Sequence, residues 1–165
     1  MIIIVKNKDT LSVDDFKFRC SIGKKGFRKK KKEGDFATPT GTFKLGNIYY
    51  RPDRTLKPLS KIKSIPIKKN MGWCDDPKSK FYNKLIKIKK NLKLKYEKLY
   101  RKDNKYDLLL LIKYNYENTI KSKGSAIFLH LTKNYFPTKG CIALSKKDFL
   151  ILSKLINNNT KIKIN

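Results

Sequence analysis

The chain has 165 residues and a formal net charge of +28, from 41 Lys and Arg against 13 Asp and Glu. This length fits one domain with a proper core, and a hydrophobic fraction of 39% with 12% aromatic residues excludes a disordered chain. Such a charge predicts attraction to polyanions, namely nucleic acid, anionic lipid or acidic wall polymers. We therefore expect one domain over residues 1–165, and we expect it to be a monomer.

Nucleic acid is the weakest of these partners. The lysines are spread along the chain, and only five of the 41 basic residues are Arg, which supplies bidentate contacts to bases and phosphates. The abundance of Lys, Ile and Asn also fits an AT-rich coding bias, which raises the charge without selection for binding. Coding bias and a nonspecific attraction to anionic envelope polymers both remain open as explanations of the charge.

The first half of the chain is predicted to form strands joined by irregular segments. Alternation places Phe16, Phe18 and Cys20 on one strand face, and the lysine run at 29–32 is expected to be a solvated part of a loop. Four prolines between residues 49 and 80 exclude long helices there. A long loop of this kind often lines a binding site. The predicted strands are 2–5, 16–22 and 40–45, with a turn at 7–9.

The second half is predicted to add strands and one or two short helices. The continuous apolar run at 106–114 is typical of a strand buried on both faces. A capping-box-like start at Ser145 predicts the helix over 146–157. The other predictions are an extended piece at 85–88, a short helix near 93–101, and strands at 126–130 and 161–164. Without repeats or linkers, the chain is expected to be mostly β.

The three cysteines are Cys20, Cys74 and Cys141. Three cysteines do not make a disulfide framework, and their spacing does not suit a zinc site. Pairing of Cys20 with Cys74 stays open, because it requires Cα atoms within about 7 Å. We expect no metal and no cofactor.

No segment predicts a membrane span or a signal peptide. Apolar runs such as 108–112 are far shorter than the roughly 20 residues that a transmembrane helix needs. The first five residues lack a basic leader and a small-residue cleavage site, and they read instead as a strand.

The only histidine, His130, ends one apolar run, and ten residues separate it from Cys141, which begins another. A strand that ends in His and a tight turn that presents Cys can bring imidazole and thiol together, as thiolate catalysis requires. Gly140 would allow a positive φ or a close backbone approach in that turn. The alternative is structural, since a lone His is usually a structural residue and a lone Cys a small buried hydrophobe.

Two sequence blocks resemble the L,D-transpeptidase (YkuD-like) catalytic-domain family. Residues 137–144 (PTKGCIAL), with the upstream His130, resemble its active-site signature, in which a Ser/Thr-x-Gly-Cys motif follows a His. Residues 32–43 (KEGDFATPTGTF) resemble its upstream E-G-D-x-x-T-P-x-G-x-F segment. Trp73–Pro77 and Tyr114-Asn115 fit a smaller branch, so the resemblance covers most of the chain.

The resemblance implies a mostly-β, sandwich- or barrel-like fold without a cofactor, and an enzyme acting on peptidoglycan stem peptides. A Cys attacks the third residue of a donor tetrapeptide, D-alanine leaves, and an amine from another stem resolves the thioester. Water as the acceptor would instead give L,D-carboxypeptidase activity. Such an enzyme belongs in the periplasm or cell envelope, whereas the N-terminal sequence predicts no signal peptide, so a cytoplasmic location stays open.

The residue roles follow from this chemistry. Cys141 is the expected nucleophile and His130 its base and acid, with a backbone carbonyl orienting the ring as is common in the family. The Gly140 and Cys141 amides are candidates for the oxyanion hole, Thr138 is expected to steady the turn, and Lys139 to favour the thiolate. The candidate substrate contacts are Trp73, Asp75, Asp76, Tyr114 and Asn115.

Some of these residues also have structural interpretations. Asp75 or Asp76 can cap a turn before Pro77 instead of contacting a substrate amine. Glu33 and Asp35 are expected to organise their loop, with Asp35 accepting from backbone N–H groups. The chain also departs from the family at Lys139 and Ala143, where many members carry His and Arg or Asn. A non-catalytic, basic wall- or polyanion-binding module therefore remains the alternative from another class.

Overall fold

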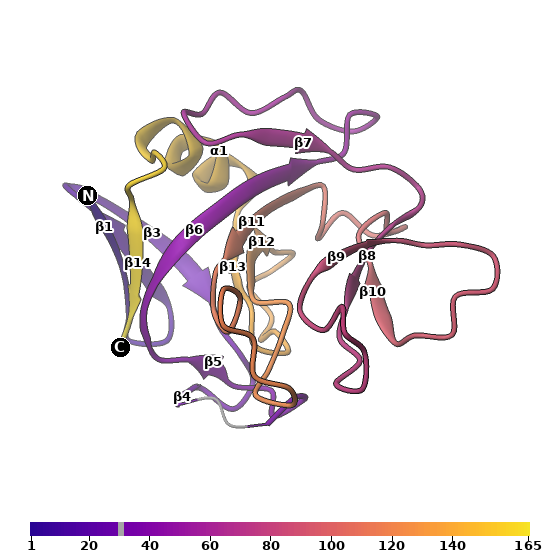
Figure 1. Ribbon diagram of the computed structural model, residues 1–165. Coiled ribbons are helices and arrows are strands. Elements are labelled where there is room, and N and C mark those ends of the chain that lie inside the picture. The colour runs from indigo at the N-terminus through magenta and orange to yellow at the C-terminus, as the bar shows by residue number, and fades with distance from the viewer. Residues whose placement is uncertain (30–31) are drawn as a thin grey trace.

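The structure is a computed structural model that describes residues 1–29 and 32–165, and its fold is mostly β (Figure 1). This confirms the fold class expected from the sequence. The lysine run at 29–32 includes residues 30 and 31, which lie outside the described residues. The elements are β1 (Ile2–Lys6), β2 (Thr10–Val13), β3 (Phe16–Ser21), β4 (Phe27–Arg28), β5 (Thr38–Pro39), β6 (Gly41–Tyr50), β7 (Ser64–Pro66), β8 (Met71–Cys74), β9 (Leu85–Lys87), β10 (Tyr96–Lys98), β11 (Leu108–Ile112), β12 (Phe128–Leu131), β13 (Ile142–Leu144), α1 (Lys146–Leu155) and β14 (Lys161–Ile164).

Nine strands form the main sheet, in the order β11-β12-β13-β3-β2-β1-β14-β6-β7. Strand β6 also pairs with β11, so the sheet closes on itself. The ten-residue β6 is longer than the strand predicted at 40–45, because it pairs in turn with β14, β11 and β7. Gly46 lies inside it, where an added Cβ would come within 2.6 Å of the Leu111 side chain. A glycine is therefore needed where β6 pairs with β11, beside the register irregularity between Leu110 and Ile112.

The apolar residues of this sheet form two clusters. Leu108, Leu110 and Ile112 of β11 belong to the larger cluster, whereas Leu109 and Leu111 belong to the smaller one. Both faces of β11 are thus buried, which explains its uninterrupted apolar sequence.

Helix α1 covers the larger cluster. It begins where Ser145 Oγ accepts a hydrogen bond from the Asp148 amide, as the capping pattern predicted. Its buried residues include Phe149 and Leu152, which belong to the larger cluster. No helix in the described part of the chain is long and apolar enough to cross a membrane.

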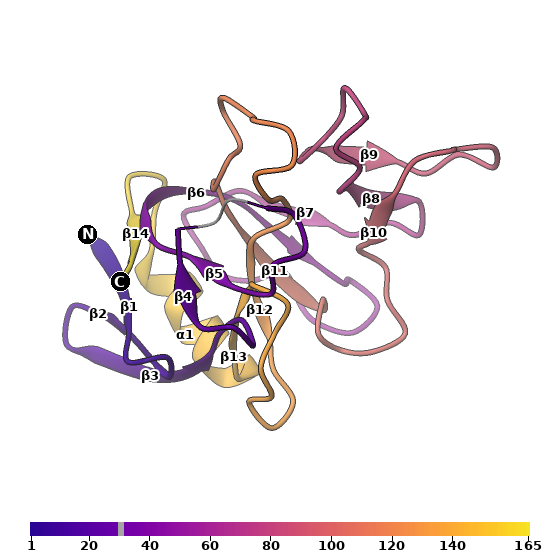
Figure 2. The same cartoon turned by 90° about the horizontal axis from the view of Figure 1, so that it is seen from below.

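Strands β10, β8 and β9 form a separate three-stranded sheet. Both views show it on the side of the molecule away from the two chain ends (Figures 1 and 2). The helix predicted near 93–101 is wrong, because this segment supplies β10, which pairs with β8. Gly72 of β8 leaves the space that Tyr96 and Ile88 occupy, so long-range packing decides the structure of this segment.

Arg51 holds the segment after β10 against the end of β6. Its side chain is buried, and it donates to both carboxylate oxygens of Asp53, at 2.8 and 2.7 Å, and to the Arg101 carbonyl at 2.7 Å. The guanidinium also lies 3.5 Å from the centre of the Tyr100 ring. These contacts hold the segment that leads from β10 to Tyr106, a residue of the cavity described next.

Candidate active site

His130 of β12 and Cys141, the residue before β13, reach one cavity, and these two strands are adjacent and parallel. In the register of β12 and β13, Leu129 lies opposite Ile142 and His130 opposite Ala143. Leu129 and Ile142 belong to the larger core cluster. Because side chains alternate along a strand, His130 and Cys141 fall on the other face. Both line a cavity of about 750 Å³.

The Cys141 thiol is held by the backbone at the start of β12. Its Sγ lies 3.2 Å from the Ala126 carbonyl, to which it donates, and 3.4 Å from the Phe128 amide, from which it accepts. The residue is 9% exposed, so the thiol is sheltered but still lines the cavity. The reactive group therefore lies immediately before β13 and is held by hydrogen bonds to the backbone of Ala126 and Phe128.

The His130 ring has a defined tautomer. Its Nδ1 lies 2.8 Å from the Leu131 carbonyl, which can only accept, so Nδ1 carries the proton. The lone pair is then on Nε2, the atom available as a base. This is the backbone carbonyl contact that the sequence analysis expected for the ring.

His130 is neutral at pH 7. Burial lowers its pKa to about 4; the contact with the Leu131 carbonyl opposes this shift, and the positive charges of Lys105 and Arg101 add to it. The imidazole also packs edge-on against the Tyr106 ring, with centroids 5.4 Å apart.

Tyr106 is itself anchored to a carboxyl group. Its hydroxyl donates to Glu97 Oε1 at 2.6 Å, and Arg101 lies 3.8 Å from the same oxygen. Burial raises the pKa of Glu97 above its usual range, against the opposing effects of Tyr106 and Arg101. The sequence analysis missed Tyr106 and Glu97. Their sequence signals are weak. Tyr106 stands at the start of a buried apolar run, and Glu97 is one of the few acidic residues of the chain.

The turn before Cys141 is held by Thr138, as expected. Its hydroxyl donates to the Cys141 carbonyl at 2.6 Å and accepts from the Gly140 amide at 3.0 Å. Gly140 has φ of +133°, which requires glycine. The Gly140 amide is thus already used, which corrects its assignment to the oxyanion hole and leaves the Cys141 amide as the candidate. Lys139 lines the cavity.

The two family-like blocks meet at this turn. Thr38 is fully buried, and its hydroxyl accepts from the Gly23 amide at 2.8 Å and donates to the Gly140 carbonyl at 2.9 Å. Asp35 accepts from the Ala37 amide at 3.1 Å, which confirms its predicted role in the loop. Glu33 accepts from Tyr82 and from Ser125, the latter at 2.6 Å. The upstream block therefore supports the nucleophile's turn.

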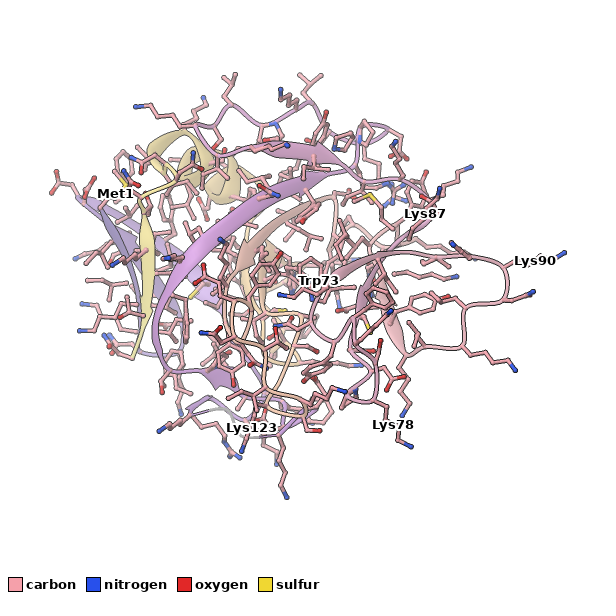
Figure 3. The ribbon with its side chains drawn as sticks, viewed as in Figure 1. Met1, Trp73, Lys78, Lys87, Lys90 and Lys123 are labelled. Atoms are coloured by element: carbon pink, nitrogen blue, oxygen red, sulfur yellow. The ribbon has the colours of Figure 1, made fainter. Side chains whose placement is uncertain are left out.

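Trp73 is a structural residue, so its prediction as a substrate contact is wrong. It is fully buried between aromatic rings, and Nε1 donates to Asn83 Oδ1 at 2.9 Å. Figure 3 shows Trp73 inside the molecule, whereas Lys78, Lys90 and Lys123 project outward. The ring is part of the smaller apolar cluster, to which Trp73 of β8 belongs.

Tyr114 and Asn115, the next two predicted substrate contacts, make structural contacts around one loop. Tyr114 packs edge-on against Phe43, and its hydroxyl donates to the Lys123 carbonyl at 2.5 Å. Asn115 accepts from the Ile120 amide at 2.8 Å and donates to the Ile120 and Gly124 carbonyls. Neither residue lines the cavity, and both hold the loop that leads to β12.

Asn83, which the sequence analysis missed, connects these supports to the thiol. It is buried, and its Oδ1 accepts from the Ala126 amide at 3.0 Å as well as from Trp73. The Ala126 carbonyl in turn accepts from Cys141. Only the fold identifies this residue, because its side-chain partners Trp73, Tyr114, Asn115 and Ala126 come from three other segments of the chain.

Asp75 and Asp76 were predicted either to cap a turn or to contact a substrate amine, and the structure places them differently. Asp76 accepts from the amides of Lys78, at 3.0 Å, and Lys95, at 3.4 Å, which is the capping role. Asp75 lines the cavity, and its Oδ1 is buried without a hydrogen-bond partner among the described residues. Burial and then the nearby Glu33 raise the pKa of Asp75. Of the five predicted substrate contacts, Asp75 is the one at the cavity.

The other two cysteines are buried as free thiols, so Cys20 and Cys74 do not pair. Burial raises the pKa of Cys20 to about 12, which makes it a poor nucleophile. Among residues 1–29 and 32–165, no group of three or more His, Cys, Asp or Glu side chains is placed to hold a metal ion.

A thiol and a neutral imidazole on adjacent strands, facing one cavity, define a site of the cysteine-nucleophile class. The family model described as YkuD, L,D-transpeptidase catalytic domain, matches residues 1–164. The chain therefore belongs to the L,D-transpeptidase catalytic-domain family, whose members act on peptidoglycan stem peptides. No curated protein matches the chain.

Proposed function

We propose that this protein is a cysteine-dependent L,D-transpeptidase that cross-links peptidoglycan stem peptides. The observation that carries the proposal is that the Cys141 thiol lines the same cavity as a His130 ring whose Nδ1 proton is fixed by the Leu131 carbonyl. That arrangement leaves one imidazole nitrogen able to accept a proton within the cavity that holds the thiol.

In the first step, Cys141 Sγ attacks the carbonyl of the third residue of a donor tetrapeptide. The thiol proton passes to His130 Nε2 as the carbon–sulfur bond forms. Because the imidazole is neutral beforehand, proton transfer accompanies attack. The Cys141 amide is our candidate donor to the oxyanion.

In the second step, the bond to the terminal D-alanine breaks, and the imidazolium returns the proton to the leaving amine. A thioester remains on Cys141. An amine of a second stem attacks this thioester, His130 accepts the amine's proton, and the thiol is regenerated as the new amide bond forms. The cross-link then joins the third residues of two stems.

Asp75 is our candidate for holding a substrate amine. Its carboxylate lies on the cavity wall and has one oxygen without a hydrogen-bond partner in the described part of the chain, and a substrate ammonium would supply that partner. Because stem peptides lie outside the cytoplasmic membrane, we propose that the protein acts in the cell envelope.

A product assay tests the proposal. The protein is incubated with a purified tetrapeptide stem, with and without a second stem as amine acceptor, and D-alanine and peptide products are measured. A cross-linked dimer with free D-alanine supports transpeptidation. Tripeptide alone, in the presence of the acceptor, would indicate the carboxypeptidase alternative. Neither product from folded protein would reject the enzyme in favour of a binding module.

A further inference from the structure

A second cavity, of about 400 Å³, adjoins the first. Pro137 lines both cavities. Ser21 of β3, on the wall of the second, lies opposite Ala143 of β13, on the wall of the first. A molecule that occupies the active-site cavity could therefore extend into its neighbour. We call the second cavity the cationic pocket, and its walls include Lys8, Asp9, Arg19, Ser21, Lys24, Lys25 and Tyr135.

Positive charge is concentrated in the cationic pocket. Four basic residues line it, namely Lys8, Arg19, Lys24 and Lys25, against the single carboxylate of Asp9. This contrasts with the active-site cavity, where Glu33, Asp75 and Glu97 lie among the basic residues. The cationic pocket therefore favours anions locally, beyond the attraction that the whole chain exerts.

Arg19 lies against an aromatic ring at the pocket wall. Its guanidinium carbon lies 4.4 Å from the centre of the Tyr135 ring, so the planar group rests on an aromatic face. Stacking of this kind leaves the N–H groups at the edge of the guanidinium plane available. Those groups match the two oxygens of a carboxylate or phosphate.

Ser21 supplies the observation that points most directly to a ligand. It is 6% exposed, and its Oγ has no hydrogen-bond partner among the described residues. Alternation along β3 places Ser21 on the same face as Arg19 and opposite to the core residue Cys20. A buried hydroxyl without a partner is destabilising, and an oxyanion in the pocket would accept its hydrogen bond.

We propose that the cationic pocket binds an oxyanion, the carboxylate or phosphate group of a larger ligand. Arg19 binds it through its N–H edge, Ser21 donates its hydroxyl, and the neighbouring ammonium groups supply charge. Two ligands carry this chemistry, namely a stem-peptide carboxylate and the phosphate of an anionic envelope polymer. The first of these rests on the function proposed above, whereas the site itself does not.

The binding test uses the full chain and inorganic phosphate at constant ionic strength, with NMR shifts of the amides of residues 21–26 as the readout. The wild type is expected to show saturable shifts. Loss of the bidentate contact in Arg19→Gln should weaken phosphate binding about tenfold. Lys17→Gln is the matched control, because Lys17 is an exposed cation on the same face of β3 that does not line the pocket. Its effect should stay within about twofold.

Two further variants separate binding from stability. Ser21→Ala should weaken phosphate binding without lowering the free energy of unfolding, because the hydroxyl has no partner among residues 1–29 and 32–165. Asp9→Asn should strengthen binding by removing the opposing charge. The proposal is wrong if phosphate causes no saturable shift, or if Lys17→Gln weakens binding as much as Arg19→Gln.

The source of the oxyanion is tested by adding phosphate to the D-alanine release assay. If phosphate raises KM without changing kcat in the wild type but not in Arg19→Gln, the pocket binds a stem-peptide carboxylate. If phosphate saturates the pocket and KM is unchanged, the site supports the envelope polymer instead. Should no stem peptide react at all, the function proposed above fails, and the phosphate titration still decides whether the pocket exists.

Discussion

The two sides of the active-site cavity are built differently. His130 lies in β12, and Cys141 immediately precedes β13; both strands are in the interior of the nine-stranded sheet, where each is paired on both sides. The opposite side comes from the three-stranded sheet, which contributes Glu97 from β10, and from Asp75 just after β8. Under the proposed function, the large sheet would hold the reacting atoms, and the side that contains Glu97 and Asp75 would hold the substrate.

The largest effect is expected at the nucleophile. Cys141→Ala should lower the rate of D-alanine release from a tetrapeptide by at least about 10⁴-fold, because no thioester can form. Cys20→Ala makes the same change at another buried thiol, in the larger core cluster, and should leave the rate unchanged. Equal losses in the two variants would mean that stability, and not chemistry, limits the reaction.

Removal of the base should have the next largest effect. His130→Gln cannot accept the thiol proton, and kcat should fall about 10²–10⁴-fold. Circular dichroism should show that the variant remains folded. A kcat within tenfold of the wild-type value would remove His130 from the mechanism.

The buried imidazole should also make stability depend on pH. The pKa of His130 is lowered from 6.5 to about 4 in the folded protein. Between these values the unfolded chain binds more protons, so this contribution to stability is lost as pH falls from 6.5 to 4. Wild type should lose on the order of 3 kcal/mol more than His130→Gln between pH 7 and pH 4.

Denaturant unfolding of both proteins measures this difference. Comparison with the variant is needed because the raised pKa values of Asp75 and Glu97 act in the opposite direction. Their stabilising contribution grows as pH falls. Parallel pH profiles for the two proteins would contradict the burial of a neutral ring.

Asn83 offers a way to disturb the thiol from the small-sheet side. Asn83→Ala leaves the buried Trp73 Nε1–H and the Ala126 amide without their acceptor. The free energy of unfolding should fall by roughly 3 kcal/mol, and kcat should fall because the Ala126 carbonyl contacts Cys141. Asn91→Ala, at an exposed position, is the control. Unchanged stability in Asn83→Ala would show that these hydrogen bonds are unimportant.

The smallest effect separates the two members of the acidic pair. Asp75→Asn removes a charge from the cavity wall and should raise KM for the stem peptide about tenfold with kcat little changed. Asp76→Asn removes the same charge from a residue that caps a turn, and should leave KM unchanged. If both substitutions change KM equally, the two carboxylates affect substrate binding only through long-range electrostatics, and Asp75 makes no specific contact.

The sequence predicted the elements whose pattern is local. The uninterrupted apolar run in β11 and the capping residue Ser145 of α1 each carry their own signal, and both elements were placed correctly. The segment at 93–101 has no clear period, and its structure depends on pairing with β8, so the predicted helix was wrong. Prediction thus held where the chain's own periodicity decides structure, and failed where a distant partner does.

The same distinction applies to the site. The sequence brought His130 and Cys141 together because strand ends and tight turns can be recognised locally. Trp73, Tyr114 and Asn115 were assigned to substrate, although each supports the fold around the thiol. Asn83, Glu97 and Tyr106 were missed, since their roles come from contacts between distant segments that no local pattern reveals.

The central claim is that Cys141 forms a covalent thioester with a stem peptide. Intact-protein mass spectrometry after mixing with a purified tetrapeptide tests it most directly, with peptide mapping to locate the adduct. The account predicts a mass increase equal to the tetrapeptide minus D-alanine, located on Cys141 and absent from Cys141→Ala. An adduct on another residue, or D-alanine release by folded Cys141→Ala at the wild-type rate, would contradict it.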